Sequence, residues 1–295
     1  MNASRTAGLT FSVAAAVIAA VSAVLPPIDA QTEMVISAFL IGVLGMPHGA
    51  LDTVFAREMF QLRTISGWIG FTLIYLFPVL LVVLVWQVAP IFFLGGFLII
   101  SIAHFSADPA SGTPLVARVF YGGAIVILPT LLHATEVARL FSLLIGGERA
   151  AAVVLWLQFL SWPWLAGIAI CAAYCFWLDW LTGIEIGAVA LLAVLASPLL
   201  AFTVFFCGMH SVRHILRTAS YAAGTTRLLF AAAILPLLAW LGLFASALLF
   251  WRDIPLEARL IQLIFVGLAA LTVPHMALVE RVRLSGWRKH PEVAR

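Results

Sequence analysis

The sequence carries little charge and little cysteine, and both shortages exclude broad classes of protein. Asp, Glu, Lys and Arg account for 10% of its 295 residues, whereas soluble domains carry about 25%. So few charges cannot cover a surface that faces water, which excludes an ordinary soluble domain. The three cysteines, Cys171, Cys175 and Cys207, all lie within apolar runs. An odd number placed in this way argues against a disulfide framework.

Apolar residues, by contrast, are abundant along the whole chain. They make up 64% of it, and the mean hydropathy is +1.13. No polar block divides the apolar runs, so we expect a single membrane domain over residues 1–295, ending in a short polar tail from about residue 281. Because a helix needs roughly 20 apolar residues to cross a bilayer, the runs predict an all-α, polytopic bundle of roughly eight to ten transmembrane helices.

Two segments leave the number of helices open. Residues 150–180 are too long for one upright helix and contain Trp162-Pro163-Trp164, so they form either one kinked, tilted helix or two short passes. Residues 8–25 are either the first span or the hydrophobic part of a signal peptide. Two passes around Pro163 place the arginine-rich loops on one side of the membrane, as the positive-inside tendency favours.

The charged residues indicate the orientation of the chain. The net charge of +3 arises from short basic clusters that follow apolar runs, as in the cytoplasmic loops of membrane proteins, and it does not indicate a nucleic-acid partner. We therefore expect a multi-pass protein of the cell (inner) membrane with a cytoplasmic C-terminus. With two passes around Pro163, Asp179 and Glu185 lie on the opposite side. Arg213 is expected to be a charge of a loop or of the lipid-headgroup region.

Two of the seven histidines are spaced as a metal-binding pair. His210 and His214 are four residues apart, so a helix places both imidazoles on one face, close enough to hold one metal ion. In a soluble helix this spacing commonly arises by chance. In a membrane helix, polar side chains are costly to bury and are usually functional, so the pair indicates a site.

Two further histidines are each followed by a carboxylate. Asp52 comes four residues after His48, and Asp108 comes four residues after His104. On a helix, such a carboxylate is near enough to accept the second ring N–H of the histidine, as it does for most metal-bound histidines. The alternative is that these acids, above all Asp108 beside Pro109, belong to solvated loops.

The candidate metal ligands are therefore His48, His104, His210 and His214. With two passes around Pro163, the apolar segments that carry the first three all descend toward the same face of the membrane, so their side chains can meet there. Neutral imidazoles suit iron, zinc or copper. A set without a carboxylate, beside an apolar cavity, favours Fe(II) that binds O₂ and keeps open coordination positions.

The remaining histidines have weaker signals. His275 lies in the last apolar run and is either a residue that lines the pocket or supports a ligand, or a helix histidine bonded to a backbone carbonyl. His133, near the opposite end of its span, is expected to be structural or interfacial. His290 lies in the polar tail and needs no role.

At these residues the chain resembles a known family. The residues that carry the resemblance are Gly45-Met46-Pro47-His48-Gly49-Ala50-Leu51-Asp52, His104-Phe105, His210-Ser211-Val212-Arg213-His214 and Pro274-His275-Met276. They occur in the same order, over nearly the whole chain, in the bacteriorhodopsin-related Brp/Blh family of bacterial and archaeal β-carotene 15,15′-dioxygenases. The combination of PHGALD with HSxRH in a polytopic protein of this length is specific.

The resemblance implies an enzyme that cleaves the central 15,15′ double bond of β-carotene with O₂ and releases two molecules of retinal. It implies Fe(II) held by the residues that match the family's ligands, which are His48, His104, His210 and His214. It also implies that the substrate arrives from membrane lipid, and it leaves open a direct transfer of retinal to a microbial rhodopsin. Oxygen insertion needs no general base, which agrees with the lack of an obvious Ser/His/Asp or paired-carboxylate set beyond the metal centre.

The chain departs from the family pattern at two places. Ser106 follows His104-Phe105 where family members often have glycine, and Gly208-Met209 precedes His210 where they often have an aromatic residue. Neither departure alters a candidate ligand. We expect both to reshape the substrate pocket, which puts the carotenoid and the cleavage position in doubt.

Two other functions use the same residues. A zinc-dependent membrane hydrolase, such as an amidase that acts on lipids, would combine the His210/His214 pair with a third ligand and a carboxylate, for which Asp52 is available. A haem or ion transporter would use the histidines as axial ligands or as groups along a pathway. Metal analysis, a haem absorption band or flux into vesicles distinguishes these functions from the dioxygenase.

Overall fold

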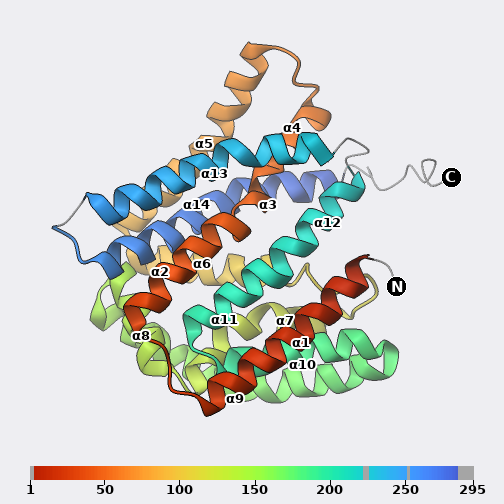
Figure 1. Ribbon diagram of the computed structural model, residues 1–295, viewed down its shortest axis with the longest axis vertical. Coiled ribbons are helices and arrows are strands. Elements are labelled where there is room, and N and C mark those ends of the chain that lie inside the picture. The colour runs from red at the N-terminus through yellow and green to blue at the C-terminus, as the bar shows by residue number, and fades with distance from the viewer. Residues whose placement is uncertain (1–2, 222–225, 251–252, 285–295) are drawn as a thin grey trace.

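The computed structural model of the chain describes residues 3–221, 226–250 and 253–284, and its regular structure there is helical (Figure 1). In chain order the elements are α1 (Ala3–Val24), α2 (Ala30–Leu40), the π-helical turn η1 (Ile41–Gly45), α3 (Pro47–Ala50), α4 (Asp52–Phe60), α5 (Ile65–Val88), α6 (Pro90–Phe105), α7 (Leu115–Ile127), the 3-10 turn η2 (Leu128–Leu131), α8 (Ala134–Ile145), α9 (Gly147–Leu178), α10 (Trp180–Leu195), α11 (Pro198–Phe205), the π-helical turn η3 (Phe206–His210), α12 (Ser211–Tyr221), α13 (Thr226–Leu249) and α14 (Leu256–Leu284). Helices satisfy their own backbone hydrogen bonds, as a bilayer requires. The predicted all-α fold is confirmed; residues 285–295 of the expected polar tail lie outside the described residues.

Long apolar helices make this a polytopic membrane bundle. Among the described residues, six helices are long and apolar enough to cross a membrane, and a seventh span results if α7–η2 and α8, which are bent by 108°, are taken together. The six are Ala3–Val24, Ala30–Phe60, Ile65–Val88, Gly147–Leu178, Pro198–Thr218 and Leu256–Arg281. Shorter apolar helices include α6 and α10. The expected eight to ten spans are therefore reached only when such short helices are counted.

The segment that left the count open forms one helix. Helix α9 continues through Pro163 for 32 residues, so the expected division into two passes at this proline is wrong. The chain reverses instead at Asp179, whose extended backbone separates α9 from α10, and Thr182 donates a hydrogen bond of 2.7 Å to its carboxylate. A proline is tolerated in a membrane helix where neighbouring groups satisfy the backbone carbonyl that it leaves free, whereas the extended backbone at Asp179 ends α9.

Two ion pairs at this end of the bundle correct the predicted sidedness. Arg5 donates to Asp179 at 2.9 Å, and Arg213 donates to Glu185 at 2.6 Å. Asp179 and Glu185 therefore share an end with these arginines, and their expected position on the opposite side is wrong. Arg213 is 3% exposed, so it is not a headgroup charge. A charge buried this deeply requires an opposite charge and hydrogen bonds to replace its lost hydration.

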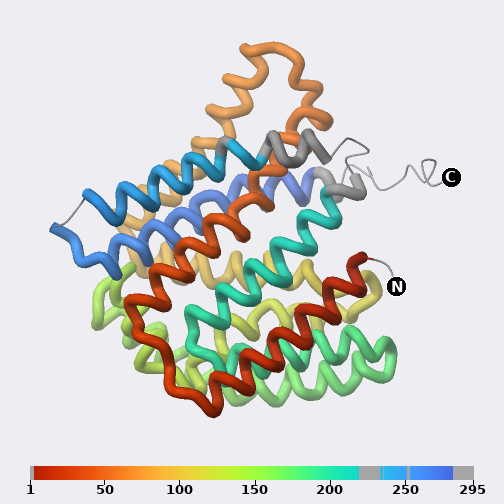
Figure 2. The backbone as a smooth tube through the Cα atoms, in the orientation of Figure 1, coloured from red at the N-terminus to blue at the C-terminus, as the bar shows by residue number. Residues whose placement is uncertain are grey.

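Helix α1 is part of the bundle, in agreement with its interpretation as a span. It packs along α10 and the α11–α12 segment (Figure 2), and the ring of Phe11 meets that of Phe205 edge to face, with 6.5 Å between their centroids. Gly8 leaves room for the Glu185–Arg213 pair, because a Cβ atom there would collide with the Glu185 carboxylate.

The buried ion pair predicts a measurable difference in stability. Glu185→Ala leaves Arg213 buried without an opposite charge, which we expect to lower the free energy of unfolding by about 3–5 kcal/mol. Arg5→Ala removes a pair whose side chains are 41% and 33% exposed, and we expect it to cost about 1 kcal/mol or less. Thermal unfolding in detergent, followed by circular dichroism, measures both. Equal melting temperatures for the two variants would show that the pair is not structurally important.

Candidate metal centre

Five histidines from five different elements converge at one point of the bundle. The ring centroid of His48 (α3) lies 5.1 Å from that of His210 (η3), 5.4 Å from that of His214 (α12) and 5.4 Å from that of His275 (α14). The ring of His104 (α6) lies 4.5 Å from that of His210 and 5.3 Å from that of His275. The rings of all four candidate ligands thus lie close together and His275 joins them, although the helix division used to align them was wrong. The group whose ligand atoms lie close to one another consists of His48, His104 and His275, and does not include His210 or His214.

Two π-helical turns face each other and shape this site. In η1 the N–H of Met46 bonds the carbonyl of Ile41 at 2.9 Å, five residues back, and η3 ends at His210. Such wide turns occur frequently at functional sites. The ring of Phe206 in η3 packs against Gly45, where a Cβ atom would collide with it. A side chain at position 45 would therefore separate the two turns, and with them His48 and His210.

The carbonyl of Gly45 determines which nitrogen of His48 faces the cluster. His48 Nδ1 donates to this oxygen at 2.5 Å, and Ser211 Oγ lies 3.1 Å from the same nitrogen. A carbonyl oxygen only accepts, so the proton resides on Nδ1. The lone pair of the neutral imidazole is then on Nε2 and is available to a metal ion.

Two carboxylates orient two further histidines in the same way. His210 Nδ1 donates to Asp108 at 2.9 Å, and His275 Nδ1 donates to Asp52 at 2.8 Å. The expected partners, His48 for Asp52 and His104 for Asp108, are wrong. The i, i+4 geometry fails because α3 ends before Leu51 and α6 ends at Phe105, so neither acid continues the helix of its histidine.

Each of the two acidic residues is held in turn by other groups. Tyr75 donates its hydroxyl to Asp52 at 2.7 Å. The backbone carbonyl of Asp108 accepts hydrogen bonds from Arg213 at 2.8 Å and Arg217 at 2.6 Å. Asp52 and Asp108 are 2% and 3% exposed, so the interpretation of these acids as solvated loop residues is wrong. The buried Glu185–Arg213 pair therefore connects, through Asp108, to His210.

The nitrogens that face the cluster lack hydrogen-bond partners. The Nε2 atoms of His210, His214 and His275 are buried and unpartnered among the described residues, and such atoms in a folded protein require an explanation. His48, His104 and His275 each offer one ligand atom, and these three atoms lie within 4.8 Å of one another. A set of neutral imidazoles with inward-facing lone pairs fits a divalent transition metal.

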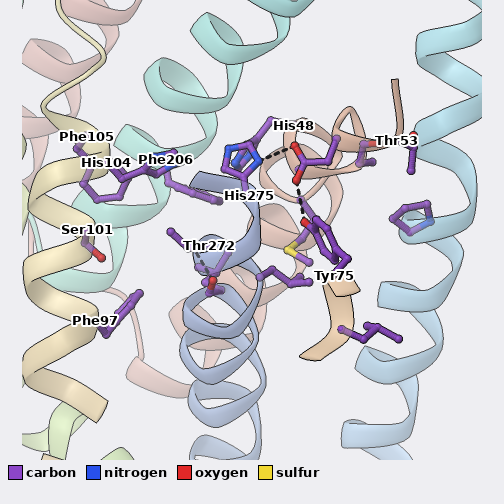
Figure 3. Close-up of a pocket in the computed structure, with 18 of the residues that line it drawn as sticks. His48, Thr53, Tyr75, Phe97, Ser101, His104, Phe105, Phe206, Thr272 and His275 are labelled. Atoms are coloured by element: carbon purple, nitrogen blue, oxygen red, sulfur yellow. Dashed lines mark hydrogen bonds and ion pairs between the residues drawn. The ribbon is translucent and has the colours of Figure 1, made fainter. Parts of the chain in front are cut away.

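An apolar cavity of about 260 Å³ opens beside the cluster (Figure 3). His48, His104 and His275 form one wall, and aromatic residues, including Phe97 and Phe206, form much of the remainder. Such a cavity suits a large apolar ligand, oriented by a few polar groups.

The residues that depart from the family pattern do not line this cavity, so the expectation that they reshape it is wrong. Ser106 donates to the carbonyl of Ile102 at 2.6 Å and packs against Gly122 of α7, which has no room for a side chain. Gly208 faces Phe11 of α1. Ser106 serves helix packing, because its backbone approaches α7 closely, whereas Gly208 has room for a side chain in ordinary contact with the Phe11 ring.

Three residues of the site escaped the sequence analysis. Gly45 and Ser211 were noted only as parts of motifs, and Tyr75 was not noted. The available signal for Tyr75 is its hydroxyl within a largely apolar span, because a polar group there needs a partner. Of the other histidines, His133 precedes α8 and makes none of the ring contacts described above, and His290 lies outside the described residues.

Comparisons with known proteins identify the family of the chain. The family model for β-carotene 15,15′-dioxygenase matches residues 39–282, which include all five clustered histidines. A β-carotene 15,15′-dioxygenase from the uncultured marine bacterium 66A03 is 32% identical over 259 residues, which cover 82% of this chain and 90% of that protein. No solved structure gives a significant match. The resemblance found in the motifs is confirmed, and the chain belongs to the β-carotene 15,15′-dioxygenase family.

Proposed function

We propose that the protein is an iron-dependent dioxygenase that cleaves the central 15,15′ double bond of β-carotene with O₂ to give two molecules of retinal. The single observation that carries the proposal is the cluster of buried imidazoles with unpartnered ring nitrogens beside an apolar cavity. Family membership supports the substrate and the cleavage position.

The metal proposal concerns five nitrogen donors. His48, His104, His210 and His214 hold Fe(II), and His275 is a further donor, because its Nε2 is buried, unpartnered and directed into the same cluster. When bound, the iron supplies binding and activation of O₂ beside the double bond. Zinc has no redox chemistry of this kind, which favours iron for this reaction.

The residues around the ion position it and the substrate. Asp52, Asp108 and the Gly45 carbonyl each hold an imidazole in the tautomer that presents Nε2. The apolar cavity excludes water and aligns the polyene. One carbon–carbon double bond breaks and each carbon takes one oxygen atom of O₂, so no proton has to move. A general acid or base is therefore unnecessary.

The hydrolase alternative is weaker on the same geometry. It requires a free carboxylate to activate water, but Asp52 is bound by His275 and Tyr75, and Asp108 is bound by His210. No observation on the described residues favours a haem or ion transporter.

We further propose that β-carotene enters laterally from the lipid of the inner membrane, since a C40 hydrocarbon dissolves there. Retinal then leaves through the same lipid phase, either to remain in the lipid or to reach a microbial rhodopsin.

Activity is the first prediction of this proposal. Bacteria that make β-carotene should lose their orange colour and accumulate retinal when they express the chain. Purified protein in detergent should require both Fe(II) and O₂, because the reaction consumes O₂ at a redox-active ion. Chromatography of the products measures the outcome. Apocarotenals of unequal length would show that cleavage is not central, and intact β-carotene after Fe(II) is restored would refute the enzyme.

The histidines provide the second prediction. Single alanine substitutions of five residues should abolish activity and lower the bound iron measured by elemental mass spectrometry: His48, His104, His210, His214 and His275. His133→Ala, which changes a histidine away from the cluster, should retain both activity and iron. Normal iron content in His214→Ala would show that this residue does not bind the ion.

The third prediction concerns the groups whose hydrogen bonds support a candidate ligand. Asp52→Asn and Tyr75→Phe should lower iron affinity or activity by about 10–100-fold, because supporting hydrogen bonds typically contribute this much. The loss should be smaller in Tyr75→Phe, where Asp52 still accepts from His275. Iron titration, which is independent of turnover, distinguishes this role from a contact with substrate. An unchanged affinity for iron in Asp52→Asn would contradict it.

A further inference from the structure

A second apolar cavity, of about 70 Å³, adjoins the one beside the histidines. It lies among α6, α7, α8 and α11, and four residues line both cavities: Phe97, Ser101, Phe105 and Phe202. The two cavities therefore share part of one wall, and three of its four residues are spaced four apart on one face of α6. Two rings of that wall, those of Phe97 and Phe202, each contact Phe265, which lines the second cavity alone, with 6.1 Å and 5.3 Å between centroids.

Helix α6 gives the distance between the histidines and this second cavity. His104 lies in the last turn of α6, and Leu94, ten residues earlier, lines the second cavity. At 1.5 Å per residue these positions are about 15 Å apart along the helix axis. Ser101 and Phe97 lie between them. This distance is of the order of half the length of a C40 polyene.

The cavity beside the histidines, the larger of these two, extends on both sides of His48 and His275. Figure 3 shows Tyr75 on one side of His48 and His275, with Phe97 and Ser101 on the other. Tyr75 belongs to α5, which has no buried residue and therefore faces outward. Apolar space thus extends from the histidines in two directions, outward beside α5 and inward along α6.

The lining of the second cavity indicates what it holds. Among the described residues that line it, none is charged and Ser101 is the one with a polar side chain; the others are aliphatic residues, prolines and phenylalanines. Such a lining favours a hydrocarbon over any ligand that needs hydrogen bonds. A substrate cleaved at its centre requires space of similar length on each side of the cleaved bond.

We propose that the second cavity binds the inner half of a C40 carotenoid, so that its depth sets the chain length accepted beyond the cleaved bond. The inference rests on the proposed function and deepens it, because it assigns one half of the substrate to residues remote from the histidines. The side chains that form the shared wall move aside to admit the chain. The far end of the cavity, formed by α7 and α8, then contacts the terminal ring.

The test pairs a variant that fills only this cavity with substrates of graded length. Val126 on α7 is half-buried and lines the second cavity but not the first. Val119→Phe is the matched control, because Val119 lies on the same helix, is 39% exposed and lines neither cavity. The substrates are β-carotene and apocarotenals that keep the 15,15′ bond and one complete ring-bearing half, with the other half shortened stepwise.

We expect Val126→Phe to lower kcat/KM for β-carotene, relative to the shortest apocarotenal, by at least about tenfold, because steric discrimination in an apolar pocket reaches this size. Val119→Phe should leave the ratio unchanged. A complementary variant, Phe141→Leu, enlarges the cavity from α8 and should raise turnover of carotenoids with a bulkier terminal ring relative to β-carotene.

Failure of this inference is distinct from failure of the proposed function. If the wild-type protein cleaves the whole series while Val126→Phe affects all lengths equally or none, the cavity does not bind the substrate. The proposal would also be overturned if Phe141→Leu left the turnover of carotenoids with a bulkier terminal ring, relative to β-carotene, unchanged. This variant adds no bulk that could impair folding. If the wild-type protein cleaves no member of the series, the proposed function falls, and this inference falls with it.

Discussion

Every polar atom inside this bundle needs a partner within the protein, because neither lipid nor an apolar core supplies hydrogen bonds. Arg213 illustrates the constraint: its side chain is buried, and its two terminal nitrogens bond Glu185 and the backbone carbonyl of Asp108. With its carbonyl held, Asp108 presents its carboxylate to His210. Under the same rule, the unpartnered Nε2 atoms of His210, His214 and His275 need an explanation, and the contacts among the rings of the cluster make them a candidate metal site.

The site also depends on where helices are interrupted. A regular α-helix consumes its carbonyl oxygens in its own backbone, but the π-helical turn at Ile41–Gly45 leaves the Gly45 carbonyl to accept from His48 and Ser211. The break after Ala50 lets Asp52 turn away from His48 and reach His275. Local irregularity therefore creates the hydrogen-bond acceptors that orient the imidazoles, while the regular helices around them supply rigidity.

Much of the architecture and of the site was predictable from particular residues. Low charge and continuous apolar runs predicted the membrane bundle, and the spacing of His210 and His214 predicted a shared helix face near a site. Pro163 was misleading, because a membrane helix tolerates a proline and α9 continues through it. Arg213 was misleading as well, since its partner Glu185 lies on another helix and is not signalled by any local pattern. That the clustered histidines bind iron stays a prediction.

The sequence by itself determined the helical class, the apolar surroundings and the identity of the candidate ligands, because these follow from composition and from residue types at short spacing. Tertiary structure alone decided the partners. Asp108 and His210 are 102 positions apart, and Asp52 and His275 are 223 apart. Short-range spacing describes only neighbours on one helix, whereas these contacts depend on how separate helices pack and on where each one ends. For that reason the carboxylates were correctly singled out and assigned to the wrong histidines.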